Sequence, residues 1–278
     1  MIPDTMCPPL ITLTTDFGSA DGYVAQMKGV LRGLVPEAVI DDLAHDIPAH
    51  NVWAGALFLE GAIPRYPAGS VHVVVVDPGV GTQRRPMVAS WRDRLVVCPD
   101  NGLLTLLWRR EGAGPIYEIG LPCAVPGVPK VLSATFHGRD LFAPVAAFLA
   151  RGGRPEHLGS PLADPVRLPF PEPLVLEDGI VVGQVIHVDR FGNAVTNMDR
   201  QLFPPEAAAG AVRIGLERAP EKEMEIRLVR TYGDIQPGEL AALINSGDRL
   251  ELATHADSAA RLWNIQAGAR VILRAVLA

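Results

Sequence analysis

The sequence contains few cysteines, only Cys7, Cys98 and Cys123 among 278 residues. They are odd in number and far apart, so they suit neither a disulfide framework nor the paired spacing of a zinc site. No stretch carries the paired histidines of a zinc-binding helix. These absences predict a protein without a metal site, in which the three thiols are reduced and buried.

Positive charge is also scarce. The 25 Lys and Arg residues are outnumbered by 31 Asp and Glu residues, and the formal net charge is -6. A protein that binds nucleic acid needs an excess of basic side chains, because the phosphates must be neutralised. We therefore expect no nucleic-acid partner, and a small-molecule ligand fits the composition better.

Long apolar runs are absent too. No uninterrupted apolar stretch reaches about 18 residues, the length that crosses a bilayer. The first residues include Asp4 and several prolines, where a signal peptide would have a basic flank and an unbroken apolar run. The sequence thus predicts a soluble, cytoplasmic protein with no membrane partner.

Three common functional motifs are missing. The stretch VDPGVGTQRR lacks the Gly-Lys-Ser/Thr ending of a P-loop, and neither glycine-rich run matches the dinucleotide fingerprint. No G-x-S-x-G elbow indicates a serine hydrolase. The charged residues that follow four consecutive valines therefore need another explanation.

Apolar runs that end in polar residues indicate buried parallel strands in the first part of the chain. Two such runs extend from Leu10 to Gly18 and from Val71 to Gly79, and Arg94 to Arg110 reads as strand, turn and helix. Helical spacing covers three further segments: Tyr23 to Leu34, Asn51 to Tyr66 and Asp140 to Gly152. This alternation predicts an α/β domain with a largely parallel central sheet flanked by helices.

Six prolines between Gly153 and Pro173 interrupt the pattern and indicate a domain boundary. We expect an N-terminal α/β domain over residues 1–165 and a second domain over residues 166–278. Short strand-like segments separated by Gly, Asp and Pro follow the boundary. They predict a C-terminal antiparallel β-barrel-like domain.

Polar clusters next to the apolar runs are the candidate sites, and each has a structural alternative. Asp16 and Asp21 could cap a helix or bind a vicinal diol such as a ribose. An Asx turn would equally explain Asp189 and Asn193. Other structural readings remain open: an ion pair for Asp77 and Arg84, a hydrogen-bonded structural histidine for His137, and a turn and helix cap for PDNG (Pro99 to Gly102). Arg85 has no predicted role.

Taken in order, TTDFGSADGYVAQMKG, HDIP, VDPGVGTQRRP, PDNGLL, TFHGRDLFAPVAA, DRFGNAVTN, TYGDIQPGE and LELATHADSAA resemble the S-adenosyl-L-methionine (SAM) hydroxide adenosyltransferase family. These SAM hydrolases are related to fluorinating and chlorinating enzymes. The resemblance extends from Ile11 to Val276. It implies an N-terminal α/β domain, a C-terminal barrel-like domain, and a homotrimer with sites between one subunit's N-terminal domain and its neighbour's C-terminal domain.

The resemblance also implies residue roles. Asp77, Arg84 and His137 match the family's water-activating triad, Asp16 matches the aspartate on the ribose hydroxyls, and Asp21 shares its loop. The other implied substrate contacts are Phe136 beside the reacting carbon, Gly138 next to it in the same motif, Asp189 and Asn193 against the methionine and nucleoside, Tyr232 on the adenine, and Ser246, Glu251 and Ala256 closing the pocket.

The halogenating relatives carry a tyrosine at the position of Asp77 and a serine at that of Gly138. A carboxylate would repel an incoming halide, so the resemblance implies water or hydroxide as the nucleophile. Gly247 stands where those relatives use an arginine on the substrate carboxylate, while His50 and His255 occupy positions that vary. The contacts at the methionine end are therefore less well defined than the triad.

The expected reaction is attack of water or hydroxide on ribose C5′, which converts SAM to adenosine and L-methionine without a metal or cofactor. Two alternatives remain at this point. One is a halide-using adenosyltransferase that forms 5′-halo-5′-deoxyadenosine, and the other is a non-catalytic sensor of adenosine or SAM.

Overall fold

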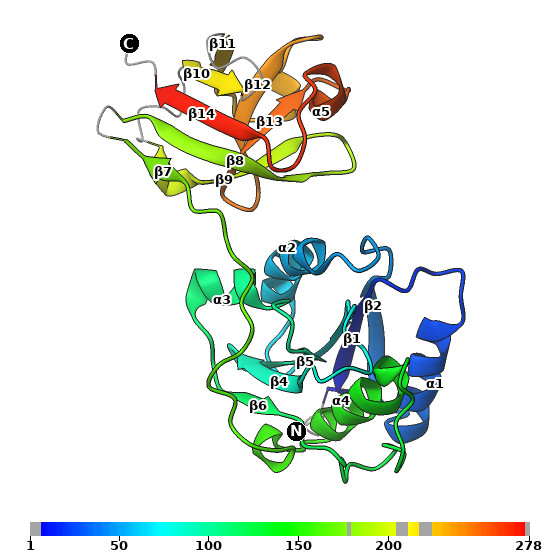
Figure 1. Cartoon of the computed structure of the whole chain (residues 1–278). Helices are drawn as coiled ribbons and strands as arrows, with labels where there is room; N and C mark the ends of the chain where they lie inside the picture. The colour runs from blue at the N-terminus through cyan, green and yellow to red at the C-terminus, as the bar shows by residue number, and fades with distance from the viewer. Residues whose placement is uncertain (1–6, 177–178, 204–210, 217–223, 276–278) are drawn as a thin grey trace, which may run out of the picture. The chain divides into compact units, whose positions relative to one another are not determined.

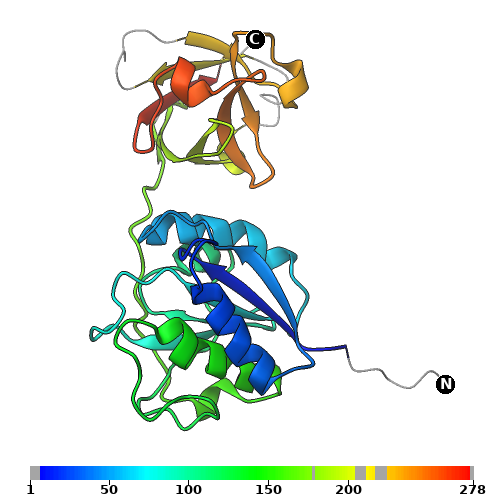
Figure 2. The ribbon, with the colours of Figure 1, turned by 90° about the vertical axis from the view of Figure 1, so that its right-hand side faces the viewer.

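The computed structural model describes residues 7–176, 179–203, 211–216 and 224–275 (Figures 1 and 2). The chain divides into two compact units, Met1–Leu168 and Pro169–Ala278. We refer to them as the N-terminal unit and the C-terminal unit, and describe each by itself. No helix in the described ranges is long and apolar enough to cross a membrane.

The N-terminal unit alternates strands with helices; η denotes a short 3₁₀ or π turn. Its elements are β1 (Leu10–Thr15), α1 (Tyr23–Leu34), β2 (Val39–Ala44), α2 (Val52–Ala62), η1 (Ile63–Arg65), β3 (Val71–Val75), β4 (Pro86–Trp91), β5 (Arg94–Pro99), α3 (Thr105–Glu111), β6 (Ile116–Glu118), η2 (Gly138–Phe142), α4 (Ala143–Ala150) and η3 (Pro155–His157).

The six strands of this unit form one sheet in the order β2-β1-β3-β5-β4-β6. The pairs β1–β2, β1–β3 and β3–β5 are parallel, whereas β4 pairs antiparallel with β5 and β6. The expected largely parallel sheet is thus confirmed as a mixed, mostly parallel one. The edge strand β2 has no apolar run, and its sequence VIDDLA did not reveal it.

Helices cover both faces of the sheet (Figure 1). Residues of α1 and α4 pack with Val71, Val73 and Val75 of β3, while α2 and the start of α3 pack with Val74 and Val76. A strand buried on both faces has no solvent side, so apolar residues fill every position of β3 except that of the buried His72. This burial explains the run of four valines from Val73 to Val76. The residues that follow the run lie at the rim of the sheet.

The C-terminal unit is built from antiparallel strands. Its elements are β7 (Leu174–Val175), β8 (Val181–Val188), β9 (Ala194–Asp199), η4 (Arg200–Leu202), β10 (Ala211–Leu216), β11 (Met224–Arg227), η6 (Tyr232–Asp234), β12 (Leu240–Ile244), β13 (Arg249–Thr254), α5 (Ala259–Leu262) and β14 (Arg270–Ala275).

The main strand order of this unit is β11-β10-β14-β8-β9-β13-β12, and β7 also pairs with β8. A bridge between Leu228 and Ala242, just after β11 and within β12, brings the two ends of the sheet together. The apolar side chains of β8, β9, β13 and β14 fill the interior. The predicted barrel-like domain is therefore confirmed as a near-closed antiparallel barrel.

The cysteines depart from one expectation. Cys98 lies buried in β5, but Cys7 is exposed and Cys123 is partly exposed. The expectation that all three thiols are buried is wrong, because Cys7 precedes the first strand and Cys123 lies in an irregular segment that packs on the core from outside. No group of three His, Cys, Asp or Glu side chains within the described ranges could hold a metal ion.

Candidate functional site

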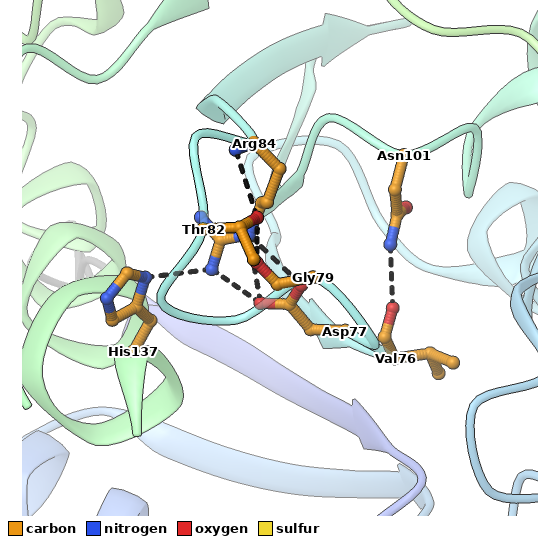
Figure 3. Close-up of polar contacts among 7 residues, drawn as sticks. All are labelled: Val76, Asp77, Gly79, Thr82, Arg84, Asn101 and His137. Carbon is orange, nitrogen blue, oxygen red and sulfur yellow. Dashed lines mark hydrogen bonds and ion pairs between the residues drawn. The ribbon is translucent and has the colours of Figure 1, made fainter. Parts of the chain in front are cut away.

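The carboxyl end of β3 delivers Asp77 to the rim of the sheet, where the chain makes a tight turn and returns at Arg84. Thr82 supports this turn, since its backbone N–H and its hydroxyl donate to the carbonyl of Gly79 at 3.2 and 2.7 Å. Asn101 supports the start of the turn by donating its side-chain amide to the Val76 carbonyl at 2.8 Å (Figure 3). The turn therefore holds Asp77 and Arg84 face to face.

Arg84 lies between Asp77 and His137 (Figure 3). Its Nε is 3.0 Å from both Asp77 carboxylate oxygens, and its Nη2 is 2.5 Å from Oδ2. The same Nη2 is 2.8 Å from Nδ1 of His137. The side chains of Asp77 and Arg84 are only 4% and 10% exposed, so water screens this ion pair weakly.

The contact with Arg84 defines the tautomer of His137. A guanidinium can only donate, so Nδ1 must accept, and the proton of the neutral imidazole is on Nε2. Burial first, and then the positive charge of Arg84, lower the pKa of His137 below its ordinary value of 6.5, although Asp77 acts in the opposite direction. At neutral pH His137 is therefore an uncharged hydrogen-bond donor through Nε2.

A close backbone approach brings His137 to the turn. Gly81 has a φ of +74°, and a Cβ at this position would lie 2.1 Å from the carbonyl oxygen of Ala134. Only glycine lets the turn lie so close to the segment that leads into His137. The guanidinium of Arg84 also lies over the ring of Phe142, with its Cζ 5.3 Å from the centroid.

A cavity of about 270 Å³ opens beside this cluster. Asp77 and His137 line it together with the predicted residues Asp16, Phe136 and Gly138. Oδ2 of Asp16 accepts the backbone N–H of His50 at 2.8 Å, which holds the carboxylate in place. Asp21 is exposed in the turn before α1 and is not among the lining residues.

A second cavity, of about 560 Å³, lies in the C-terminal unit. Four of the predicted substrate contacts line it: Asp189, Asn193, Tyr232 and Ala256. The structure shows that Asp189 also makes an Asx turn, because its Oδ1 accepts the backbone N–H groups of Phe191 and Asn193 at 2.9 and 2.8 Å. The structural and functional readings of this hairpin are therefore compatible.

Two predicted contacts lie elsewhere. Glu251 is 3% exposed and does not line the cavity; its carboxylate accepts the Tyr232 hydroxyl at 2.7 Å and the Asn245 amide at 2.9 Å. Burial and this bond to Glu251 raise the pKa of Tyr232. Ser246 is exposed in the turn between β12 and β13 and is likewise not among the lining residues.

The predicted set also missed several lining residues. In the N-terminal cavity these are Phe17, Tyr23, Ala49, His50, Val75, Val80 and Thr135, and in the C-terminal cavity Phe191, Thr254, Asp257 and Ser258. Phe191 carried a usable signal, since a phenylalanine in a polar hairpin is out of place, and it is 76% exposed. The others had none, because strand and turn residues reach a cavity only through tertiary contacts.

Arg85, which had no predicted role, anchors a different part of the N-terminal unit. Its Nε donates to Oδ2 of the buried Asp100 at 2.9 Å, and its Nη1 and Nη2 donate to the side chain and carbonyl of Asp164 at 2.8 Å. Asp100 also accepts the Val166 N–H at 2.7 Å.

The expectation that PDNG (Pro99 to Gly102) caps a helix is wrong, because the N-cap of α3 is Leu104.

The fold and the two cavities define a class of protein. An α/β unit carries an Asp–Arg–His cluster at the carboxyl end of its parallel strands, and a near-closed antiparallel barrel carries a second cavity lined by polar and aromatic side chains. Ligands of open α/β sheets bind at this end of the strands. This class is that of two-domain proteins which bind a small molecule.

The chain belongs to the SAM hydroxide adenosyltransferase family. The sequence pattern of the family's N-terminal domain matches residues 11–159, and that of its C-terminal domain matches residues 183–272. This membership confirms the resemblance seen in the sequence motifs.

Individual relatives agree with the family assignment. Proteins named (R)-S-adenosyl-L-methionine hydrolase from Salinispora tropica and Thermus thermophilus are each 40% identical, over 95% and 93% of this chain and 97% of theirs. A fluorinase from Nocardia brasiliensis is 28% identical over 95% of this chain and 96% of its own. A solved structure from Thermotoga maritima superimposes with a TM-score of 0.86 at 34% identity, covering 95% of this chain and 99% of that one.

Proposed function

We propose that this protein hydrolyses SAM to adenosine and L-methionine, and that it acts on the (R) epimer at sulfur. The observation that carries the proposal is the carboxylate of Asp77, held by Arg84 beside His137 at the wall of a cavity. The (R) epimer is proposed because four relatives, 35–40% identical over nearly the full chain, bear the name (R)-S-adenosyl-L-methionine hydrolase.

The proposed reaction forms a bond between a water oxygen and C5′ of the ribose and breaks the bond from C5′ to sulfur. The bond electrons go to the sulfonium, so methionine leaves as a neutral thioether, and one proton is lost from the attacking water. Ionising that water beforehand at pH 7 would cost about 9 pK units, or roughly 12 kcal/mol. A positioned general base supplies about 10²–10⁴ in rate, roughly 3–5.5 kcal/mol, so proton removal must accompany attack.

The tautomer of His137 supports a division of roles within the triad. Both of its nitrogens are committed, Nδ1 to Arg84 and Nε2 to its own proton, so His137 orients the water as a donor. Asp77 can accept a hydrogen bond from the water and is the proposed proton acceptor. Arg84 holds both partners and balances the charge of the carboxylate.

The remaining residues are proposed as substrate contacts. Asp16 would bind the ribose hydroxyls in the N-terminal cavity, where Phe136 and Gly138 would lie beside the reacting carbon. Asp189, Asn193, Tyr232 and Ala256 line the C-terminal cavity and would contact nucleoside and methionine groups. Glu251 would act through Tyr232 rather than directly. Direct contacts from Asp21 and Ser246 stay predictions, as do the homotrimer and a cytoplasmic location.

A halide-using activity is the main alternative, since fluorinases are 26–28% identical to this chain. A halide would have to approach the Asp77 carboxylate in a site that screens charge weakly. Neutral water that gives its proton to that carboxylate as it attacks meets no such repulsion. The geometry therefore favours hydrolysis.

The test is incubation of the purified protein with (R)-SAM and (S)-SAM separately in ¹⁸O-water, with and without chloride, followed by chromatography and mass spectrometry. We expect faster consumption of the (R) epimer, with the label in the 5′ oxygen of adenosine. A 5′-halogenated product, or adenosine without label, would overturn the hydrolase. Saturable binding without any product would make the protein a sensor.

A further inference from the structure

Three aromatic side chains form one wall of the N-terminal cavity. Phe17 follows β1, Tyr23 begins α1, and Phe136 precedes His137. The ring centroids lie 5.7 Å apart for Phe17–Tyr23, 5.8 Å for Phe17–Phe136 and 5.3 Å for Tyr23–Phe136. All three residues line the cavity, so we call them the aromatic wall.

Gly138 is part of the same arrangement. A Cβ at this position would lie 3.2 Å from Sδ of Met27, 3.3 Å from the Phe136 ring and 3.5 Å from the Phe17 ring. The distances to Met27 and Phe136 are tight, whereas that to Phe17 is an ordinary contact, so a larger residue would press on Met27 and Phe136. The glycine therefore lets the Phe136 ring lie close to the start of η2.

Phe136 already makes a cation–π contact. Cζ of Arg139 lies 5.1 Å from its ring centroid, and Arg139 is held there by Asp140 and by Gln26. Tyr23 is 47% exposed and is the ring of the wall most accessible to a ligand. The carboxylate of Asp16 lines the same cavity, as does that of Asp77, which is paired with Arg84. Aromatic rings together with carboxylates favour a positively charged ligand group.

We propose that the aromatic wall binds the sulfonium group of the substrate, and that Tyr23 determines the preference for positively charged over neutral adenosyl ligands. The proposal rests on the proposed function. A ring attracts a cation through its quadrupole, and a neutral thioether at the same place gains only apolar contact. The wall would thus separate substrate from the uncharged sulfur product.

The charge of the substrate changes during the reaction, and this change gives the wall a kinetic signature. The sulfonium loses its positive charge as C5′–S breaks, so its attraction to Tyr23 is strongest in the ground state and weakens in the transition state. An interaction of this kind lowers KM without raising kcat. Because Tyr23 is half exposed, we expect an effect of about 3–10-fold in affinity, equivalent to roughly 0.6–1.4 kcal/mol.

The experiment compares two inhibitors that differ in charge at the sulfur position: sinefungin, a cationic amine, and S-adenosyl-L-homocysteine, a neutral thioether. Their dissociation constants are measured for the wild type, Tyr23→Phe and Tyr23→Leu. We expect Tyr23→Leu to weaken sinefungin about 3–10-fold and the thioether less than about twofold. In SAM turnover, KM should rise with kcat unchanged or higher, and Tyr23→Phe, which keeps the ring, should behave like the wild type.

Equal weakening of both inhibitors by Tyr23→Leu, or no change for either, would overturn the role of Tyr23. If Tyr23→Leu does not fold, pentafluorophenylalanine at position 23 keeps the ring and reverses its quadrupole, and must weaken sinefungin selectively relative to Tyr23→Phe. Charge-selective binding without turnover would overturn the proposed hydrolase activity but support the role of the aromatic wall in binding a cation. Turnover of SAM with no charge selectivity at position 23 would support the hydrolase activity and overturn the role of Tyr23.

Discussion

At the scale of single residues, the proposed chemistry depends on how the guanidinium of Arg84 is shared. Arg84 donates to the Asp77 carboxylate and to Nδ1 of His137, so the charge of one partner and the tautomer of the other depend on the same side chain. A lysine could not make the same contacts, because it lacks the planar fork of donors.

Replacement of Asp77 by asparagine tests the proposed proton acceptor. The amide keeps the shape of the side chain but cannot take a proton at neutral pH, so we expect kcat to fall at least a hundredfold while substrate binding stays measurable by calorimetry. Glu37→Gln, at an exposed acid between α1 and β2, is the matched control and should keep full activity. Wild-type-like adenosine release by Asp77→Asn would refute the role of Asp77.

The acid limb of the pH–rate profile should report His137. Burial and Arg84 lower its pKa, so the neutral ring persists to more acidic pH than an ordinary histidine. Below that pKa, Nδ1 carries a proton and can no longer accept from Arg84. We expect kcat/KM to fall with a midpoint below 6.5, and NMR titration of the ring to match it. An acid limb at or above 6.5 would contradict this assignment.

At the scale of elements, turns rather than helices or strands connect the candidate catalytic residues. The turn after β3 packs on the segment before His137 through Gly81, and the neighbouring residue Arg85 bonds to the loop after β5 and to the segment around Asp164. The adjacent residues Arg84 and Arg85 therefore make different contacts: Arg84 lies beside the cavity, and Arg85 ties two loops of the N-terminal unit together.

The two aspartates on Arg85 should differ sharply in their effect on stability. Asp100 is 1% exposed in its side chain and accepts from both Arg85 and Val166, whereas Asp164 is 81% exposed. We expect Asp100→Ala to lower the free energy of unfolding by about 2–3 kcal/mol, because buried, charge-assisted hydrogen bonds are lost. Asp164→Ala is the matched control and should change it little. Similar urea midpoints for the two variants would show that burial does not matter here.

At the scale of the whole molecule, a second histidine should make stability depend on pH. His72 in β3 is fully buried between the hydroxyls of Thr12 and Ser70, which lie 2.7 and 2.9 Å from its ring nitrogens. Burial first, and then the charge of Arg94, lower its pKa from 6.5 to about 4. Between these values the unfolded chain binds a proton that the folded chain does not, so stability falls as pH falls.

The expected loss from His72 between pH 6.5 and pH 4 is about 3 kcal/mol, because 2.5 pK units correspond to that energy. Denaturant unfolding of the full chain across this range measures it. His72→Gln should flatten the pH dependence, while His157→Gln, at an exposed histidine, should leave it as in the wild type. A slope that survives in His72→Gln would assign the effect to other groups.

The sequence alone was enough for the fold class and the family. The fold class could be predicted because local sequence patterns reflect packing and backbone geometry. The patterns used were the valine runs, the helical spacing and the six clustered prolines. Edge strands such as β2 were missed, because VIDDLA lacks the apolar run of a strand buried on both faces. Motif order identified the family, since long motifs in a set order are specific in combination.

Only the tertiary structure decided how the candidate residues contact one another. Asp77 and His137 are separated by 60 positions, and no spacing rule could place Arg84 between them or assign the proton of His137 to Nε2. In the same way, Glu251 proved to be a buried partner of Tyr232. Sequence records which groups are present; hydrogen bonding and charge depend on distances of a few ångströms, and these are set only when distant segments pack together.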